Sequence, residues 1–569
     1  MNQSNLAINS LNDSDNNINV LVDPKDRKLS MVHMYVAFVA FIIGVFGGLL
    51  QGLARGGMIE LPSWLGYYQI LTAHGVLLAL VFTTFFIYGF FFAGMGKTHG
   101  AFSNRLRKIG WAGYITMLAG TIITTIMILL NEASVLYTFY VPLQAHSLFY
   151  VGLTLVIVGS WIASAALLTH YFKWKKANPG KPTPLFGFMT TATLILWIVA
   201  GLGVATSVLY QILPWALGLT DEVNVLLTRT LFWYFGHPLV YFWIMPAYMI
   251  WYVVIPKVIG GRLFSSSLAR LAFILFLLFS IPVGFHHQLM ESGISELWKF
   301  IQTVLTFVVV VPSLLTAFSI FATFEQTARE KGGKGIIGWI KTLPWGDVRF
   351  FAPFMGMLAF IPAGAGGIIN ASFQLNAVVH NTLWVVGHFH LTVGTTVLLT
   401  FFGAAYWLIP ALTGRRFTKH ANRCGIVQTW LWMIGMFFMS GAMHLLGLFG
   451  APRRTAYATY GDHPQALQWF EGIFASHITV AIGGVILTAA GVLMFYNFIY
   501  LAFRAPKGNT EFPITPDPDD TPHIPAFLEN WKLWIGIVIL LIIFAYTIPV
   551  YEMIVDAPPG SPPFNFLIR

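Results

Sequence analysis

The chain has 569 residues, of which 57% are hydrophobic and only 9% are charged, and its formal net charge is +10. Soluble domains carry roughly 25% charged residues, so this composition excludes a soluble enzyme of this length and predicts that apolar side chains face lipid. The single cysteine, Cys424, excludes a disulfide framework, a covalent Cys-x-x-Cys-His haem site and a thiolate-bridged metal cluster within the chain.

The N-terminal residues 1–30 are polar and rich in Asn, Asp and Ser, which predicts a disordered cytoplasmic tail. Apolar stretches of about 20 residues then follow one another to residue 555, without an internal repeat or a soluble domain. The expected spans are residues 31–53, 69–93, 109–130, 145–171, 187–212, 226–255, 268–289, 299–324, 350–371, 378–409, 424–448, 473–502 and 533–553. The sequence therefore predicts an all-α integral membrane bundle of about thirteen transmembrane helices, forming one domain over residues 31–555, with residues 556–569 as a short outer C-terminal segment.

The positions of the basic residues predict how this bundle lies in the membrane. If the N-terminus is inside, the inner segments hold 26 Lys and Arg residues and the outer segments hold 6, which together account for all 32. Cytoplasmic loops of membrane proteins carry such an excess. We therefore expect a multi-pass protein with a cytoplasmic N-terminus, and its positive charge requires no nucleic-acid partner.

Six histidines are expected in the outer half of the bilayer, on four different spans. They are His74 on the second span, His237 on the sixth, His286 and His287 on the seventh, and His388 and His390 on the tenth. Ionisable residues at membrane depth are costly and usually functional, and neutral imidazole is the commonest metal ligand. The alternative, six independent hydrogen-bonded core histidines, would scatter them over both halves of the membrane.

Helical geometry divides these histidines between sites. Residues two positions apart differ by about 200° in direction, so His388 and His390 point to opposite sides of the tenth span, and one helix can hold two cofactors. The neighbours His286 and His287 diverge by only about 100°, so both can turn toward one ion, and His237 could complete a three-imidazole site. Three nitrogens without a thiolate favour copper or zinc and leave an open position for a small molecule.

Hydroxyl side chains lead inward from His237. Tyr241 lies four residues further along the same helix face, and Tyr248 and Tyr252 continue that face towards the inner side. The eighth span and an inner loop add Ser313, Thr316, Ser319, Thr323, Ser265 and Ser266. Together they predict a proton route from the cytoplasm to the site. The alternative is that these hydroxyls merely join helices or bond to helix carbonyls.

The motifs resemble those of subunit I of the haem–copper oxidase superfamily over nearly the whole chain. The resemblance is carried by Gly236-His237-Pro238 with Tyr241, by the pair His286-His287, and by Gly387-His388-Phe389-His390, with a histidine in the second span. Thirteen spans, and Leu239 where the main mitochondrial-like branch commonly has glutamate, are similar to the B-type, ba-type cytochrome c oxidases. The resemblance implies the catalytic subunit of a terminal respiratory oxygen reductase in a prokaryotic plasma membrane. This oxidoreductase would couple four-electron reduction of O2 to water with proton uptake and pumping.

The resemblance also implies roles for individual residues. His74 and His390 would be the axial ligands of a low-spin haem b, and His388 would be the proximal ligand of a high-spin haem of a or o type. One copper ion would be held by His237, His286 and His287. Tyr241 would be covalently joined to His237 and would supply an electron and a proton when the O–O bond is cleaved. The single proton channel would consist of Tyr241, Tyr248, Tyr252, Ser265, Ser313, Thr316 and Ser319.

The resemblance places the haem propionates near two arginines, Arg453 and Arg454, in the outer loop after the eleventh span. Guanidinium groups suit such carboxylates. One nearby position departs from the B-type pattern, since Asn376 stands where that pattern has an aspartate. An asparagine cannot titrate, so His380 is the remaining candidate for a group that loads or releases pumped protons.

The resemblance further implies partners and leaves two rival functions. The partners would be a subunit II with a dinuclear copper centre, cytochrome c or quinol as the electron donor, O2 and membrane lipid. One rival is nitric oxide reduction on the same scaffold. Tyr241, and the lack of a carboxylate near the three expected copper ligands, favour oxygen over nitric oxide. The second rival is a transporter without cofactors, which would show no haem absorbance.

Overall fold

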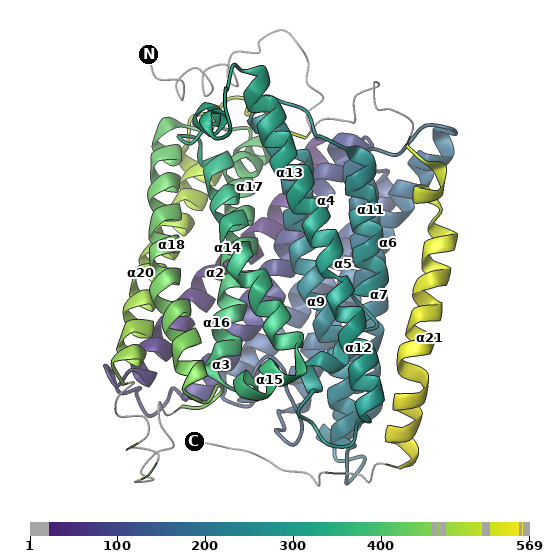
Figure 1. Cartoon of the computed structure of the whole chain (residues 1–569), viewed down its shortest axis with the longest axis vertical. Helices are drawn as coiled ribbons and strands as arrows, with labels where there is room; N and C mark the ends of the chain where they lie inside the picture. Colours follow the sequence, from purple (N-terminus) through teal and green to yellow (C-terminus); the bar gives the residue numbers. More distant parts are fainter. Residues whose placement is uncertain are drawn as a thin grey trace.

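The computed structural model describes residues 22–456, 474–514 and 524–556, together with residues 465, 468 and 560. Over these residues the chain is almost entirely helical and forms no strand. The helices lie side by side along the long axis of the molecule (Figure 1). Twelve of the helical segments described are long and apolar enough to cross a membrane, which confirms the predicted fold class.

The first half of the bundle contains seven of the expected spans. Its elements are α2 (Pro24–Arg55), α3 (Tyr67–Gly75), η1 (Val76–Phe82), α4 (Thr83–Thr98), α5 (Asn104–Leu129), α6 (Ser147–Ala177), α7 (Leu185–Ser207), η2 (Val208–Ile212), α8 (Leu213–Ala216), α9 (Val225–Val253), α10 (Ile255–Val258), α11 (Ser266–Phe279) and η3 (Gly284–Gln288). Consecutive elements such as α3, η1 and α4 form one continuous span.

The second half contains the remaining spans. Its elements are α12 (Glu296–Val308), α13 (Val310–Glu330), η4 (Gly338–Thr342), α14 (Val348–Ala371), α15 (Phe373–Val379), α16 (Leu383–Leu391), η5 (Thr392–Val397), α17 (Leu398–Thr413), α18 (Lys419–Leu448), α20 (Phe474–Ile499), η7 (Tyr500–Arg504), η8 (Ala526–Glu529) and α21 (Trp531–Val555). The π-helical segments η1 and η5 begin shortly after His74 and His390.

The most deeply buried spans carry most of the expected ligands. In the most apolar stretch of each span, we compared the percentage of residues that are buried. It is 89% for Tyr67–Thr98, 83% for Val225–Val258 and 100% for Leu383–Thr413, and these are the three highest values among the described spans. These segments contain His74, His237, and the pair His388 and His390. The centre of the bundle is therefore built around the histidines, and the other helices form its outer layer.

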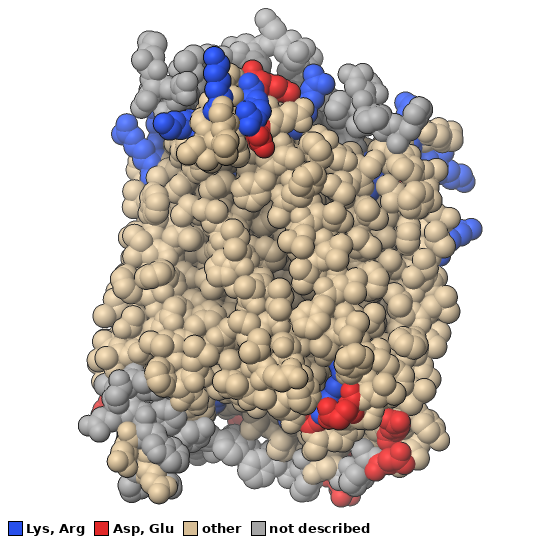
Figure 2. All heavy atoms as spheres, in the orientation of Figure 1, with Lys and Arg blue, Asp and Glu red and all other residues tan. Residues whose placement is uncertain are grey.

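The outer surface fits a membrane setting. On the face shown in Figure 2, the charged side chains gather toward the two ends, and a broad belt of uncharged residues separates them. Many large apolar side chains are exposed on the helices, such as Phe437 at 76% and Leu540 at 67%. Lipid, not water, is the solvent that such a surface requires.

Two predicted boundaries differ from the structure. The polar tail was expected to reach residue 30, but α2 already begins at Pro24, because Asp23 caps it and the buried Asp26 carboxylate accepts hydrogen bonds from Arg107 and from the Phe102 backbone. The predicted seventh span, residues 268–289, contains only the 14-residue helix α11 and then η3. Residues 1–21, 557–559 and 561–569 of the two predicted terminal segments lie outside the described residues.

Candidate metal centre

Three histidines converge on one point between α9 and η3. Each of His237, His286 and His287 offers a nitrogen, and these nitrogens lie within 4.8 Å of one another. The Nδ1 atom of His237 lies 3.2 Å from the Nε2 atom of His287. Two nitrogens bound tetrahedrally to one ion, at about 2.0–2.1 Å each, lie roughly 3.4 Å apart. The trio therefore fits a single metal ion.

Surrounding groups fix the orientation of the paired imidazoles. The Nδ1 atom of His286 lies 2.6 Å from the Val283 carbonyl oxygen and 3.0 Å from the Thr306 hydroxyl, which leaves its Nε2 atom for a metal. The His287 ring stacks on Trp233 of α9, with ring centroids 3.8 Å apart and an angle of 9° between the planes. Such outer contacts orient metal ligands and tune their basicity.

The prediction that His286 and His287 lie on the seventh membrane helix was wrong in one respect. Helix α11 ends at Phe279, shortly before Pro282, which has no backbone N–H to continue the helix. The pair lies on the separate 3₁₀ turn η3. Successive residues of a 3₁₀ turn differ by about 120° in direction, so both rings still reach the same ion.

His74 of α3 and His390 of α16 face each other across the centre of the bundle. Their ring centroids lie 6.2 Å apart, and their planes differ by 17°. Two imidazoles on opposite sides of one metal, with bonds of about 2.0–2.1 Å, place their centroids roughly 6.4 Å apart. The Nδ1 atom of each ring lies 2.8 Å from a backbone carbonyl oxygen, that of Gly44 or Val386, so both Nε2 atoms are free to bind iron.

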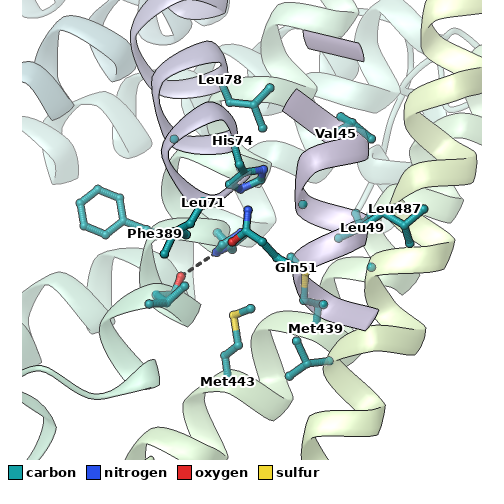
Figure 3. A pocket seen from close by; sticks show the side chains of 18 of the residues that line it. Val45, Leu49, Gln51, Leu71, His74, Leu78, Phe389, Met439, Met443 and Leu487 are labelled. Atoms are coloured by element: carbon teal, nitrogen blue, oxygen red, sulfur yellow. Dashed lines mark hydrogen bonds between the residues drawn. The ribbon is translucent and has the colours of Figure 1, made fainter. Parts of the chain in front are cut away.

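A cavity of about 300 Å³ surrounds these two rings and has the size of a ligand site. Figure 3 shows His74 directed into this pocket, with Phe389 on one side and Leu49 on the other. A Cβ atom on Gly48 would lie 2.8 Å from the His74 ring, so this close approach of α2 requires glycine. The mostly apolar lining fits the faces of a porphyrin.

Arginines contribute to the lining of this cavity. Arg453 and Arg454 line the cavity, whereas Asn376 and His380 do not. Burial, and to a smaller extent the charge of Arg454, lower the pKa of Arg453 to about 9. No carboxylate of the described residues forms an ion pair with Arg453 or Arg454. The pair therefore favours an anionic ligand group.

Asn376 and His380 bond to each other in the outer loop. The His380 Nδ1–H donates to the Asn376 side-chain oxygen over 3.1 Å, and the Asn376 amide donates to the Asn370 carbonyl over 2.7 Å. Burial, followed by the charges of Arg453 and Arg454, lowers the pKa of His380 to about 4. Asn376 thus holds His380 in one orientation.

His388 points away from His390, as the helical period predicted. Its Nδ1 atom faces the backbone of α14, where a Cβ atom on Gly366 would lie 2.7 Å from it. His390, two residues later, faces His74 instead. One short helix, α16, therefore presents imidazoles to two separate spaces.

The tyrosines of the predicted proton route contact α13. The Tyr252 hydroxyl donates to the Thr316 hydroxyl over 2.9 Å, and the Tyr248 hydroxyl donates to Ser313 over 3.4 Å. Thr316 in turn donates to the Pro312 carbonyl, so the hydroxyls both join helices and bond within them. Two separate hydroxyl pairs therefore join α9 to α13 along the predicted route.

At the inner end of the predicted route, the hydroxyls bond to backbone groups or have no hydrogen-bond partner among the described residues. Thr323 accepts a hydrogen bond from the Phe264 backbone and donates to the Ser319 carbonyl, while the buried Ser319 hydroxyl has no partner among the described residues. Ser265 accepts from the Leu268 backbone and so caps α11. The Ser265 hydroxyl therefore has a structural role, in line with the alternative that these hydroxyls stabilise helices.

Residues 28–486 match the family model described as Cytochrome C and Quinol oxidase polypeptide I. The chain belongs to this family. It is 40% identical to cytochrome c oxidase subunit 1 of Thermus thermophilus over 538 residues, which cover 92% of this chain and 94% of that protein. It is 25% identical to quinol oxidase subunit 1 of Bacillus subtilis over 496 residues, covering 83% and 71% of the two chains.

A solved structure supports the same assignment. It is described as a heme-copper terminal oxidase dimer, and it matches with a TM-score of 0.90 and 36% identity over 96% of both chains. The resemblance inferred from the histidine motifs is therefore confirmed. The protein is subunit I of a haem–copper terminal oxidase, an oxidoreductase of the prokaryotic plasma membrane.

Several residues that shape the oxidase site were not predicted from the sequence. They are Gly48, Trp233, Thr306, Gln302 and Tyr546. Trp233 could have been found, because it lies four residues before His237 and so shares its helix face. The others contact the histidines, or the turn that carries them, from other helices. A helical period does not reveal contacts of this kind.

Proposed function

We propose that this oxidase subunit reduces O2 to water at a site bounded by His388 on one side and by His237, His286 and His287 on the other. When bound, the haems would supply electron transfer and an open iron position, and the copper would supply the second metal. The single observation that carries the proposal is the convergence of three imidazole nitrogens beside Tyr241. The group contains no carboxylate among the described residues, which favours oxygen over nitric oxide.

We further infer that His74 and His390 hold a low-spin haem b and that His388 holds a high-spin haem of a or o type. The 6.2 Å separation of the first two rings, and the hydrogen bonds that commit each Nδ1 atom, support the low-spin assignment. Two axial imidazoles leave no open position on the iron. Arg453 and Arg454 would neutralise the propionates of this haem.

Tyr241 is proposed as the residue that donates a proton and an electron at the site. Its ring centroid lies 5.1 Å from that of His237. The Nε2 atom of His237 is buried and has no hydrogen-bond partner among the described residues, so it is free for the covalent bond to Tyr241. Protons would reach Tyr241 from the inner side through Tyr248, Tyr252, Ser313, Thr316 and Ser319.

A subunit II with a dinuclear copper centre is proposed as the electron-entry partner, because the single cysteine of this chain cannot form one. The names of the relatives include both cytochrome c and quinol oxidases. The identity of 40% to the cytochrome c oxidase, against 25% to the quinol oxidase, favours cytochrome c as the donor.

Turnover of the purified complex tests the proposal. With reduced cytochrome c, we expect consumption of O2 with four electrons per molecule and no hydrogen peroxide. A parallel assay with nitric oxide should be slow, and a quinol should be a poorer donor. Faster consumption of nitric oxide than of O2 would contradict the proposed reaction. A pyridine haemochrome spectrum of the same sample should show haem b together with haem a or o.

A further inference from the structure

Helix α21 is the most peripheral of the described spans, yet one of its side chains reaches the turn that carries two of the expected copper ligands. It lies at the edge of the bundle (Figure 1), and only 22% of its most apolar stretch is buried. Tyr546 of this helix is nevertheless only 6% exposed. Its hydroxyl accepts a hydrogen bond from the Gly284 backbone over 3.0 Å and donates to the Ile281 carbonyl over 3.2 Å.

The segment between α11 and η3 needs such partners. Because α11 ends at Phe279 and Pro282 carries no N–H, the backbone groups that follow lack helical hydrogen bonds. The Gly284 N–H is satisfied by Tyr546, and the Phe285 N–H donates to the Gln302 side-chain oxygen over 2.9 Å. Phe285 and Gln302 are fully buried, so loss of these acceptors would leave backbone N–H groups unsatisfied.

Gln302 of α12 connects the turn to α21 and to the imidazole of His286. Its amide donates to the Ala545 carbonyl of α21 over 3.0 Å. Its backbone carbonyl accepts from the Thr306 hydroxyl over 2.7 Å, and that hydroxyl lies 3.0 Å from the His286 Nδ1 atom. Gln302 therefore contacts α21 through its side chain and, through its backbone carbonyl and Thr306, the ring of His286.

The turn is also held closely from both sides. A Cβ atom on Gly284 would lie 2.7 Å from the Tyr546 hydroxyl oxygen and 3.0 Å from the Trp233 backbone. Trp233 stacks on His287, so α9 and α21 enclose the turn. Any shift of η3 would move His286 and His287 together relative to His237.

We propose that Tyr546 and Gln302 are positioning residues that hold η3 so that His286 and His287 face His237. This inference rests on the proposed function, in which the three histidines bind copper. A tyrosine that only filled space at the edge of the bundle would need no hydroxyl. The two hydrogen bonds to the broken segment indicate a more specific task for Tyr546.

Copper retention in the purified oxidase complex tests the inference. The variants are Tyr546→Phe, which removes the hydroxyl, and Gln302→Met, which removes the side-chain bonds to Phe285 and Ala545 but keeps the backbone carbonyl, both with little change in volume. The matched control is Tyr551→Phe on the same helix, since Tyr551 is 63% exposed. Copper per iron is measured while a copper chelator is titrated, and the haem spectrum monitors assembly. Loss of a partner that bonds directly to a metal ligand typically weakens metal binding about 10–100-fold. Tyr546 and Gln302 bond to the turn that carries the ligands, so both variants should release copper at roughly 10-fold lower chelator concentration, the lower end of that range.

A second readout is the infrared band of carbon monoxide on the reduced copper after photolysis from the haem. The band should shift or broaden in Tyr546→Phe and Gln302→Met and should be unchanged in Tyr551→Phe. A purely structural weakening of the bundle would not change this band selectively.

The possible outcomes separate the two proposals. Absence of copper from the wild-type complex would overturn the proposed function itself. If the wild type binds copper and both variants release it at the same chelator concentration as Tyr551→Phe, the positioning role is wrong while the function stands. If Tyr546→Phe alone fails to retain haem, the chelator concentration at which Gln302→Met releases copper decides whether the positioning role is right. Loss of haem together with copper in both variants would also contradict the inference, because these contacts would then support the whole fold.

Discussion

At the scale of single residues, His237 has two nitrogens with different surroundings. Its Nδ1 atom faces His287, while its Nε2 atom has no hydrogen-bond partner in the described part of the chain. Tyr241 shares its helix face and lies in ring contact with it. Under the proposed function, the same short stretch of α9 would supply a metal ligand and a proton donor.

Replacement of Tyr241 by phenylalanine tests this pairing. The Tyr241→Phe variant keeps the ring and loses the hydroxyl, so haem and copper contents should be unchanged. Oxygen consumption should fall by about 100-fold or more, as expected when a positioned proton donor is removed. An oxygen electrode measures this loss. Tyr210→Phe, at a residue that is 80% exposed, is the control. Turnover close to that of the control would contradict the role of Tyr241.

A second prediction concerns the space beside His74. In Gly48→Ala the added methyl would lie 2.8 Å from the His74 ring, so His74 should be displaced and the bis-histidine haem weakened. The reduced-minus-oxidised spectrum should lose most of the low-spin haem b band. Gly441→Ala is the control, because a Cβ atom there meets nothing within 4 Å. An unchanged haem b content in Gly48→Ala would show that the pocket does not hold this haem as proposed.

The six histidines could be singled out from the sequence because ionisable residues at membrane depth are costly and usually functional. The period of a helix was enough to separate His388 from His390 and to align Tyr241 with His237. Gly48 and Tyr546 could not be found in this way. Their importance depends on which helices become neighbours, and hydropathy alone contains no such information.

At the scale of elements, hydropathy predicted the spans well but not the break in the seventh. A stretch of about 20 apolar residues was read as a continuous helix. The structure instead ends α11 at Phe279 and places η3 after it. Pro282 was a visible signal for this break. The fold tolerates the irregular backbone because side chains from α12 and α21 supply hydrogen-bond partners.

The inner end of α21 is anchored by Glu529, just before the helix. Its carboxylate accepts hydrogen bonds from Lys175 over 2.8 Å and from the Thr183 hydroxyl over 2.6 Å. Burial alone would raise the pKa of Glu529, but these hydrogen bonds and the charge of Arg270 lower it below its ordinary value. The ionised carboxylate is therefore favoured by the folded state.

This shift predicts a pH dependence. Because the Glu529 carboxyl is more acidic in the folded protein, its stabilisation is complete above the unfolded pKa of about 4.3 and is lost as the pH falls toward the folded pKa. Glu529→Gln should lower the unfolding free energy at pH 7 by about 1–3 kcal/mol and should weaken the acid dependence. Thermal unfolding across this pH range measures both effects. Glu325→Gln, at a surface pair, is the control. An acid dependence equal to that of the wild type would contradict the assignment.

At the scale of the whole molecule, the charge distribution and the position of the site indicate from which side of the membrane electrons and protons would reach the oxidase. The basic residues predicted for the inner side outnumber those predicted for the outer side, and the six histidines are predicted in the outer half of their spans. The contacts between α9 and α13 continue from the site towards the inner side. Electrons and protons would therefore arrive from opposite sides of the membrane.

Interrupting the proton route should slow the whole reaction. Thr316→Val removes the hydroxyl that accepts from Tyr252 and keeps the shape of the side chain. Oxygen turnover and proton uptake from the inner side of reconstituted vesicles should both fall several-fold, with haem spectra unchanged. Thr479→Val is the control, because the Thr479 hydroxyl is exposed and bonds only within its own helix. A normal rate of proton uptake in Thr316→Val would exclude Thr316 from the route.

The most direct test of the central claim is the metal content of the purified subunit and of one ligand variant. We expect two iron atoms and one copper ion for each wild-type chain. In His286→Ala we expect loss of copper with both irons retained, because His286 belongs to the trio that converges with His237 and His287. Full retention of copper in His286→Ala, or a wild-type chain without iron, would contradict the account.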